Sequence, residues 1–328
     1  MPKEYRIIDS TLREGEQTPG VSFTIVQKKN ILNRLARIGV AEAEIGIASP
    51  LIGNLDTIVD YCRTNLPSLN ISLWSRCKEG DIKYAAKLKP DILSLSIPVS
   101  DLHLKAKFNK TREWAKNKLS DSINFARELG LRVSVGFEDA TRADIEFITE
   151  LATVASKHGA ERIRLADTVG ISSPKKMSNL VRSVKTISSK CEIAVHTHND
   201  FGMATANAVA ALESGATWAD ATVLGLGERS GCARLEELAV YLTMQTKYCK
   251  MSIQYLKELS TYVASIALLS IERGRPIVGN DIFTCETGLH LHGLKKNVKT
   301  YEPYPPESVG AERRFIFGAK SGCQAMKF

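Results

Sequence analysis

Residues 192–224 read EIAVHTHNDFGMATANAVAALESGATWADATVL, and this stretch contains the pattern that decides the fold. A short β-rich run, residues 192–198, precedes an alanine-rich helical segment, and a second β-rich run, residues 218–224, follows that segment. Two strands joined by a helix are usually parallel and belong to one sheet. The stretch therefore predicts a β-α-β unit.

The same alternation of strand and helix runs through most of the chain. Two of the helices carry end signals, since Ser173 precedes Pro174 at a helix start and Gly159 follows a helix end. Eight such units in about 250 residues predict an α/β fold, the (β/α)8 TIM barrel, rather than an open sheet. The six further predicted strands are residues 5–9, 41–48, 70–75, 91–97, 132–137 and 162–167.

From about residue 251 the pattern changes. A helical segment, residues 252–274, is followed by a stretch that Gly and Pro interrupt repeatedly, up to residue 310. We therefore predict a catalytic barrel in residues 1–250. Residues 251–328 are expected to form a C-terminal helical appendage and an irregular arm that covers the active site.

The composition is that of an ordinary globular protein, with 44% of the 328 residues hydrophobic and 24% charged. The net charge is +8, but Lys and Arg are spread along helical segments, so we expect no nucleic-acid partner. No apolar run reaches the ~18 residues of a membrane span, and the N-terminus has no signal-peptide core. We therefore expect a cytoplasmic protein without a membrane partner.

The cysteines are odd in number, scattered, and without C-x-x-C spacing. This pattern favours reduced thiols over a disulfide framework or a structural zinc site. The seven positions are Cys62, Cys77, Cys191, Cys232, Cys249, Cys285 and Cys323.

Charged and polar residues gather where the predicted strands end. In a barrel these ends converge on one mouth, so we expect the functional side chains to meet there. The first strand ends in the motif IIDSTLREGEQTPG, residues 7–20. The candidates are Asp9, Arg13, Glu14, Glu138, Asp139, Asp167, Thr168, His196, His198, Asn199, Asp200, Glu228 and Arg229.

His196 and His198 are the most informative pair. Alternate residues of a strand point to the same side, so both imidazoles face one way. With a carboxylate from across the barrel they would bind a divalent metal ion, Mg²⁺, Mn²⁺, Zn²⁺ or Co²⁺. An isolated H-x-H is more often structural, but the acidic end of the first strand favours a metal. We select Glu14 as the third ligand, while Asp9 is better explained as a cap for backbone N–H groups.

Arg13 and Glu138 are the next candidates. A guanidinium beside a metal suits a carboxylate or a developing enolate, and the alternative for Arg13 is a salt bridge to Glu16 or Asp9. Glu138 is either a general acid/base or a residue that begins a helix, and the sequence leaves both open.

Six motifs, in chain order, resemble the acyl-CoA-condensing enzymes related to isopropylmalate, citramalate and homocitrate synthases. The resemblance covers residues 4 to about 322, and within the family the chain is most similar to homocitrate synthases of nitrogen-fixing systems. The motifs are DSTLREGEQ (9–17), FEDATRAD (137–144), LADTVG (165–170), HTHNDFGMATANAVAALESGA (196–216), GLGERSG (225–231) and ETGLHLHGLKKNVKTYEPYPPESVG (286–310).

The resemblance implies a Claisen condensation of acetyl-CoA, the co-substrate, with a 2-oxo acid. The metal, held by Glu14, His196 and His198, would chelate the 2-oxo acid, and Arg13 would stabilise the oxygen that gains charge. Hydrolysis of the thioester would then release CoA. With 2-oxoglutarate as the 2-oxo acid, the product would be homocitrate.

The resemblance also assigns residues outside the metal site. His290 of the arm would remove a proton from the acetyl methyl group, with Glu138 and Tyr301, while Gln17 and Thr168 would touch the 2-oxo acid. In this family the arm covers the barrel of the partner subunit, so the resemblance implies a homodimer.

This chain also departs from the family pattern. Cys232 stands where Asn is usual, either as a fourth metal ligand or, as we favour, as a small buried residue. His292 replaces an acid near His290. Ser134 and Gly136 stand where lysine-pathway relatives use an Arg for the second carboxylate of 2-oxoglutarate. Other candidates for that carboxylate are Arg76, Lys78 and Ser94.

These departures leave three alternatives open. The first is a synthase of the isopropylmalate or citramalate type that uses another 2-oxo acid. The second is a lyase or aldolase of the same superfamily, and the third is a barrel that has kept its metal but not its catalysis.

Overall fold

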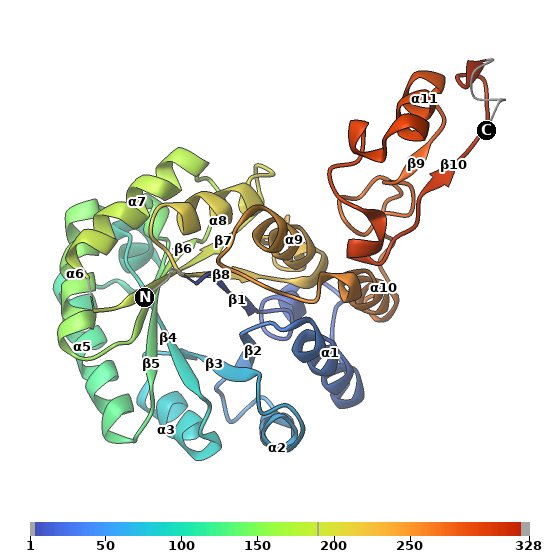
Figure 1. Ribbon diagram of the computed structural model, residues 1–328. Helices are drawn as coiled ribbons and strands as arrows, with labels where there is room; N and C mark the ends of the chain where they lie inside the picture. The colour runs from blue at the N-terminus through green and yellow to red at the C-terminus, as the bar shows by residue number, and fades with distance from the viewer. Residues whose placement is uncertain (1–3, 189, 323–328) are drawn as a thin grey trace.

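Eight parallel strands close into a barrel in the computed structural model, which describes residues 4–188 and 190–322 (Figure 1). Each strand pairs with the next, and β8 returns to β1 through the pair Ile8 and Asp220. The predicted (β/α)8 fold is confirmed. The strands are β1 (Arg6–Asp9), β2 (Glu42–Ile47), β3 (Asn70–Arg76), β4 (Ile92–Pro98), β5 (Val133–Glu138), β6 (Arg162–Asp167), β7 (Glu192–Thr197) and β8 (Trp218–Ala221).

Helices cover the outer face of the barrel and alternate with its strands (Figure 1). The last predicted strand was too long, because residues 223–225 form a 3-10 turn in which Leu224 adopts a left-handed φ of 60°. The helices are α1 (Ile25–Ile38), α2 (Leu55–Asn65), α3 (Glu79–Leu88), α4 (Asp101–His103), α5 (Arg112–Glu128), α6 (Ile145–Lys157), α7 (Pro174–Ile187), α8 (Ala204–Glu213), α9 (Leu235–Gln245), α10 (Leu256–Ile266) and α11 (Gly288–Lys296).

Both predicted helix-end signals are confirmed. The Ser173 side chain accepts a hydrogen bond from the Lys176 backbone N–H, and Pro174 opens α7. Gly159 follows α6 with φ of +88°, and a Cβ there would lie 2.4 Å from the Arg127 guanidinium. Only glycine fits that position without strain.

The barrel interior is polar, because alternate strand residues point to opposite faces. Aliphatic residues such as Leu73 and Leu95 belong to the core between strands and helices. The opposite alternation turns charges inward, so Arg162 donates to Glu42 at 2.7 and 2.9 Å. Since these charges are paired below the surface, they hold one another in fixed orientations.

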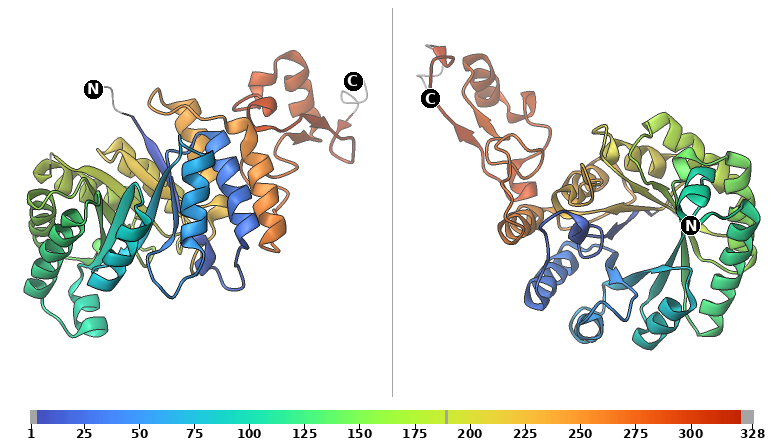
Figure 2. Two further views of the ribbon diagram at one scale, coloured as in Figure 1. Left: turned by 90° about the horizontal axis from the view of Figure 1, so that it is seen from below. Right: turned by 180° about the vertical axis from the view of Figure 1, so that it is seen from behind.

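The C-terminal part leaves the barrel after α10. This helix packs on α1, where Glu258 pairs with Arg34 at 3.3 Å and Arg37 at 3.2 Å. The following arm contains α11 and a small parallel sheet of β9 (Thr284–Cys285) and β10 (Arg314–Phe315). In each view it extends away from the barrel (Figures 1 and 2). A domain boundary at residue 250 stays a prediction, and residues 323–328 of the predicted arm lie outside the described residues.

Two further expectations concern cysteines and membranes. The cysteines of the described residues form no disulfide, and Cys323 lies outside them. Within residues 4–188 and 190–322, every helix is too short or too polar to cross a membrane.

Candidate active site

Glu14, His196 and His198 meet at the mouth of the barrel, as predicted. The Nε2 atoms of the two imidazoles lie 3.2 Å apart, and they lie 3.8 and 4.0 Å from the Glu14 carboxylate. All three residues are at least 95% buried. With Cys232, they form a group whose possible ligand atoms lie within 4.8 Å of one another. These residues could hold a metal ion.

Asp220 of β8 orients His196. Its Oδ2 lies 2.9 Å from His196 Nδ1 and 2.8 Å from Nη1 of Arg164. A proton on Nδ1 leaves Nε2 with its lone pair toward Glu14, which is the tautomer that a metal requires. Asp220 was absent from the candidates, because its contacts with His196 on β7 and Arg164 on β6 cannot be read from the sequence around it.

The electrostatics also suit a divalent cation. Burial alone would raise the pKa of Glu14, but the positive charge of Arg13 outweighs it and lowers that pKa to about 2. Burial lowers the pKa of His198 to about 3, so its imidazole is neutral. An ionised carboxylate and neutral imidazoles are the forms that bind metals.

Cys232 is buried beside this group. Burial raises the pKa of its thiol well above the ordinary value, so the thiolate form is disfavoured. Its Sγ lies 3.9 Å from His198 Nδ1, whereas His198 Nε2 is the nitrogen that faces Glu14. A Cβ on Gly227 would lie 3.0 Å from that Sγ and 3.3 Å from Glu14. This geometry favours the packing role over the role of fourth ligand.

Arg13 lies between two carboxylates. It donates to Glu14 and, at 2.5 Å, to Glu44 of β2. Glu44 also accepts from Arg164 at 2.8 Å, so one buried carboxylate holds two guanidinium groups. Arg13 Nη2 has no acceptor in the described part of the chain, and Arg13 lines the cavity beside the metal ligands.

The salt-bridge alternatives for Arg13 are wrong. Asp9 accepts hydrogen bonds from Thr11, at 3.0 Å from its backbone N–H and 2.9 Å from its hydroxyl. Burial raises the pKa of Asp9 to about 7. Glu16 instead pairs with Lys28 at 2.6 Å. Asp9 therefore supports the loop after β1, as its predicted capping role requires.

A cavity of about 270 Å³ opens over the metal ligands. Gln17 and Thr168, for which substrate contacts are predicted, both line it. The Gln17 amide, turned to donate, reaches Glu14 at 3.0 and 3.2 Å, and the Thr168 hydroxyl accepts from the Asp139 N–H at 2.8 Å. The lining residues are Arg13, Glu14, Gln17, Ile47, Trp74, Ser96, Lys107, Gly136, Glu138, Arg164, Ala166, Thr168, His196, His198 and Glu228.

Glu138 lies at the edge of this cavity with two partners that the sequence reasoning missed. Its Oε1 lies 2.9 Å from Nδ1 of His103 and also pairs with Lys107. Both partners follow β4, on α4 and on the π-helical turn Leu104–Phe108. The available signal was the run of basic residues that begins at His103, five residues after β4 ends.

His290 and Tyr301 lie together on the arm and not with Glu138. Their ring centroids are 4.0 Å apart, His290 is exposed, and 45% of the Tyr301 surface is exposed. Neither residue lines the 270 Å³ cavity of its own chain. The expected group of His290, Glu138 and Tyr301 is therefore not assembled within one chain, because the arm extends away from its own barrel.

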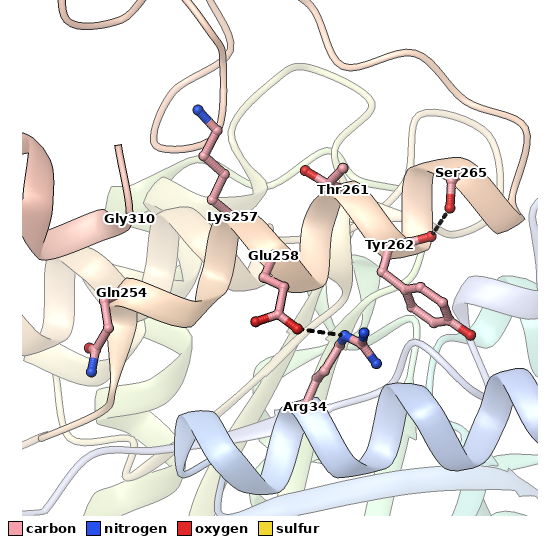
Figure 3. A pocket seen from close by; sticks show the side chains of 8 residues that line it. All are labelled: Arg34, Gln254, Lys257, Glu258, Thr261, Tyr262, Ser265 and Gly310. Carbon is pink, nitrogen blue, oxygen red and sulfur yellow. Dashed lines mark hydrogen bonds and ion pairs between the residues drawn. The ribbon is translucent and has the colours of Figure 1, made fainter. Parts of the chain in front are cut away.

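A second hollow, of about 420 Å³, lies between α1 and α10 (Figure 3). Arg34 pairs there with Glu258 and stacks on Tyr262 at 4.3 Å. None of Glu14, His196 and His198 lines this hollow. It lies at the contact between the barrel and the base of the arm.

Comparison with known proteins identifies the family of this chain. The model of the HMGL-like family matches residues 4–263, which include every barrel residue discussed above. The chain belongs to the HMGL-like family. A second model, described as homocitrate synthase post-HMGL domain-like, matches residues 277–328 and therefore the arm.

Within the HMGL-like family, the chain groups with 2-oxo-acid synthases. It is 40% identical to a homocitrate synthase of Frankia alni, over 98% of this chain and 92% of that protein. It is 38% identical to 2-isopropylmalate synthase 2 of Caldanaerobacter subterraneus, over 99% and 84%. It is 39% identical to an (R)-citramalate synthase of Methanocaldococcus jannaschii, over 98% and 66%.

Solved structures of HMG-CoA lyases share the fold. The enzyme of Brucella melitensis has a TM-score of 0.71 at 20% identity, over 81% of this chain and 99% of that chain. The Acinetobacter baumannii enzyme, in complex with coenzyme A and 3-methylmalate, has a TM-score of 0.71 at 20% identity, over 92% and 98%. At this identity the likeness concerns the fold alone.

Proposed function

We propose that this HMGL-like protein is an acyltransferase that condenses acetyl-CoA with 2-oxoglutarate and releases homocitrate and CoA. The observation that carries the proposal is the buried group of Glu14, His196 and His198, with Arg13 beside it, under a cavity of small-molecule size. Relatives at 38–40% identity that are named as 2-oxo-acid synthases support it. Membership of the nitrogen-fixation type is part of the proposal.

The barrel residues would act on the 2-oxo acid. A divalent metal held by Glu14, His196 and His198 supplies a Lewis acid for the carbonyl group when it is bound. Arg13 would donate from Nη2 to the carbonyl oxygen as that oxygen gains charge, since its other nitrogens are already held by Glu14 and Glu44. A guanidinium fixed in this way needs no reorganisation during the reaction.

A base must take a proton from the acetyl methyl group before the new carbon–carbon bond forms. We assign the removal of this proton to His290, with Tyr301 against its ring and Glu138 on the barrel side. The methyl carbon then attacks the keto carbon, and the former keto oxygen receives a proton. Water hydrolyses the thioester in a separate step and releases CoA.

Because the arm extends away from its own barrel, His290 would reach Glu138 only in a second copy of the chain. We therefore propose a homodimer in which each arm covers the mouth of the partner's barrel. The exposed surfaces of His290 and Tyr301 support this, since both rings are available for a contact.

Release of CoA thiol tests the proposal. The purified protein would be incubated with Mg²⁺ or Mn²⁺, acetyl-CoA, and each of 2-oxoglutarate, pyruvate and 2-oxoisovalerate, and the product identified by mass. The fastest release is expected with 2-oxoglutarate. Preference for pyruvate or 2-oxoisovalerate would instead assign a citramalate or isopropylmalate type of synthase, and no release with any 2-oxo acid would reject the proposal.

A further inference from the structure

Arg164 has one edge that the protein does not use. The residue lies on β6 and is 96% buried, with a relative exposure of 4%. Its Nη1 donates to Glu44 and to Asp220, each at 2.8 Å. Its Nε and Nη2 have no acceptor among residues 4–188 and 190–322, although Arg164 lines the 270 Å³ cavity. Neither nitrogen is among the described side-chain atoms that are closed off from solvent without a partner, so this guanidinium edge is open to the cavity and available to a ligand.

The space beside this edge is hollow and polar. Gly136 of β5 has no side chain there, and a Cβ at this position would lie 3.8 Å from Arg164 Nε and 3.8 Å from Ser96 Oγ. The Ser96 hydroxyl likewise has no protein partner in the described part of the chain, and Ser96 lines the same cavity. A guanidinium edge and a hydroxyl therefore face one small hollow over Gly136.

The hollow is connected to the metal group through shared carboxylates. Asp220 Oδ2 binds both Arg164 Nη1 and His196 Nδ1, at 2.8 and 2.9 Å. Glu44 binds both Arg164 and Arg13. A ligand in this cavity could therefore have one end at the metal ligands and the other end at Arg164.

The earlier candidates for a second carboxylate site do not face this cavity. Arg76 pairs with Asp81 at 2.6 Å, and it lines a neighbouring hollow of about 390 Å³ together with Lys78. Ser94 is 1% exposed and does not line the cavity, since it lies two residues before Ser96 on β4 and one layer deeper. Among the basic side chains of the cavity floor, Arg164 has the geometry for a carboxylate.

We propose that Arg164 and Ser96, over Gly136, bind the distal carboxylate of a dicarboxylic 2-oxo acid and so select such acids over monocarboxylic ones. This inference rests on the proposed function. Two N–H groups on one guanidinium edge match the two oxygens of a carboxylate, and the contact is stronger in a buried site. Burial alone would lower the pKa of Arg164, but Asp220 and Glu44 raise it, so the guanidinium stays charged.

The test uses two isosteric variants, Gly136→Asp and Gly136→Asn. The nearest atom to the new Cβ would be the Leu95 carbonyl oxygen at 3.5 Å, an ordinary contact, so both variants are expected to fold. The Asp carboxylate would occupy the Arg164 edge, whereas the Asn amide adds the same bulk without charge. The KM for 2-oxoglutarate should be at least ~10-fold higher in Gly136→Asp than in Gly136→Asn.

The matched substrate is 2-oxopentanoate, which has the same five carbons without the distal carboxylate. Wild-type protein should have a KM for it at least ~10-fold above that for 2-oxoglutarate. The KM for 2-oxopentanoate should differ by less than about 3-fold between the Asp and Asn variants. This acid has no distal carboxylate, so only the added bulk, which is the same in both variants, affects its binding. Ser94→Ala, one layer deeper, should leave every KM unchanged.

Calorimetry with Mn²⁺ and 2-oxoglutarate, without acetyl-CoA, separates binding from turnover. Binding should weaken in Gly136→Asp relative to Gly136→Asn, as KM does. The inference would be overturned if CoA were released but the two variants had the same KM and affinity for 2-oxoglutarate. It would also be overturned if the wild type had the same KM for 2-oxoglutarate and 2-oxopentanoate. Absence of CoA release with every 2-oxo acid would instead overturn the proposed function.

Discussion

The barrel mouth and the arm hold their polar residues in opposite ways. At the mouth, Glu14 and His196 are at least 95% buried, and carboxylates from β2 and β8 orient the groups around them. On the arm, His290 is exposed and its recorded contact is the ring of Tyr301 in the same arm. The polar groups of the mouth are organised within one chain, whereas His290 and Tyr301 of the arm are left exposed.

This difference explains where preorganisation comes from. Three carboxylates and two guanidinium groups fix one another beneath the mouth, so the side chains of this group keep their geometry before any ligand binds. The ring of His290 instead lies exposed beside Tyr301 of the same arm. Variants in the two regions should therefore fail in different ways.

The largest effect is expected for Glu14→Ala. It removes the anionic metal ligand and leaves Arg13 with one carboxylate, so CoA release should fall by at least ~10³-fold. Titration with Mn²⁺ should show that metal binding is lost as well. Glu16→Gln, in the same loop, breaks only the pair with Lys28 and should keep metal binding. Normal metal affinity in Glu14→Ala would contradict the assigned ligand set.

His290→Ala should lower CoA release by about 100-fold, because a general base is lost, while metal binding stays normal. The neighbouring His292→Ala serves as the control and should keep most activity. Mixing His290→Ala chains with Glu138→Gln chains tests whether the arm of one chain acts on the barrel of another. If the arm acts on the partner's barrel, mixed dimers contain one intact site and activity returns; no recovery would argue against the exchange of arms.

Asp220→Asn tests how the barrel orients its ligands. An amide cannot hold His196 Nδ1–H as a carboxylate does, so metal affinity should fall by about 10–100-fold. Isothermal titration measures this loss directly. Asp81→Asn provides the control, since Asp81 is also buried and paired with an Arg, but at the barrel rim. Equal losses in the two variants would indicate a general stability effect rather than orientation.

The smallest effect concerns stability. Burial raises the pKa of Glu236, at the start of α9, to about 7, and one of its oxygens has no partner among the described residues. The native state therefore binds this proton more tightly than the unfolded state, and its stabilising contribution is lost as pH rises toward 7. Glu236→Gln should match the wild type near pH 4.5 and exceed it by about 1–3 kcal/mol at pH 8.

Urea unfolding at both pH values measures that difference. The measurement at low pH is the internal control, because the wild-type carboxyl is then protonated like the neutral amide. A gap between the two proteins that does not change with pH would refute the assignment.

The contrast between the two regions also appears in what could be predicted. The barrel mouth was predicted well, because strand ends converge and alternate residues share a face, so Glu14, His196 and His198 were brought together by topology alone. Asp220 and Arg164 were missed, although both lie on predicted strands. Their importance comes from neighbours on other strands, and that pairing is not written in the local sequence.

By itself, the sequence determined the eight strands, the closed barrel and the meeting of Glu14, His196 and His198 at its mouth, because local periodicity and the convergence of strand ends need no further information. Only the tertiary structure decided that Glu44 and Asp220 orient the site, that His103 and Lys107 meet Glu138, and that Arg164 turns a free edge toward Gly136. It also separated His290 from its own barrel. Such contacts join residues distant in the chain, so they follow from packing and not from pattern.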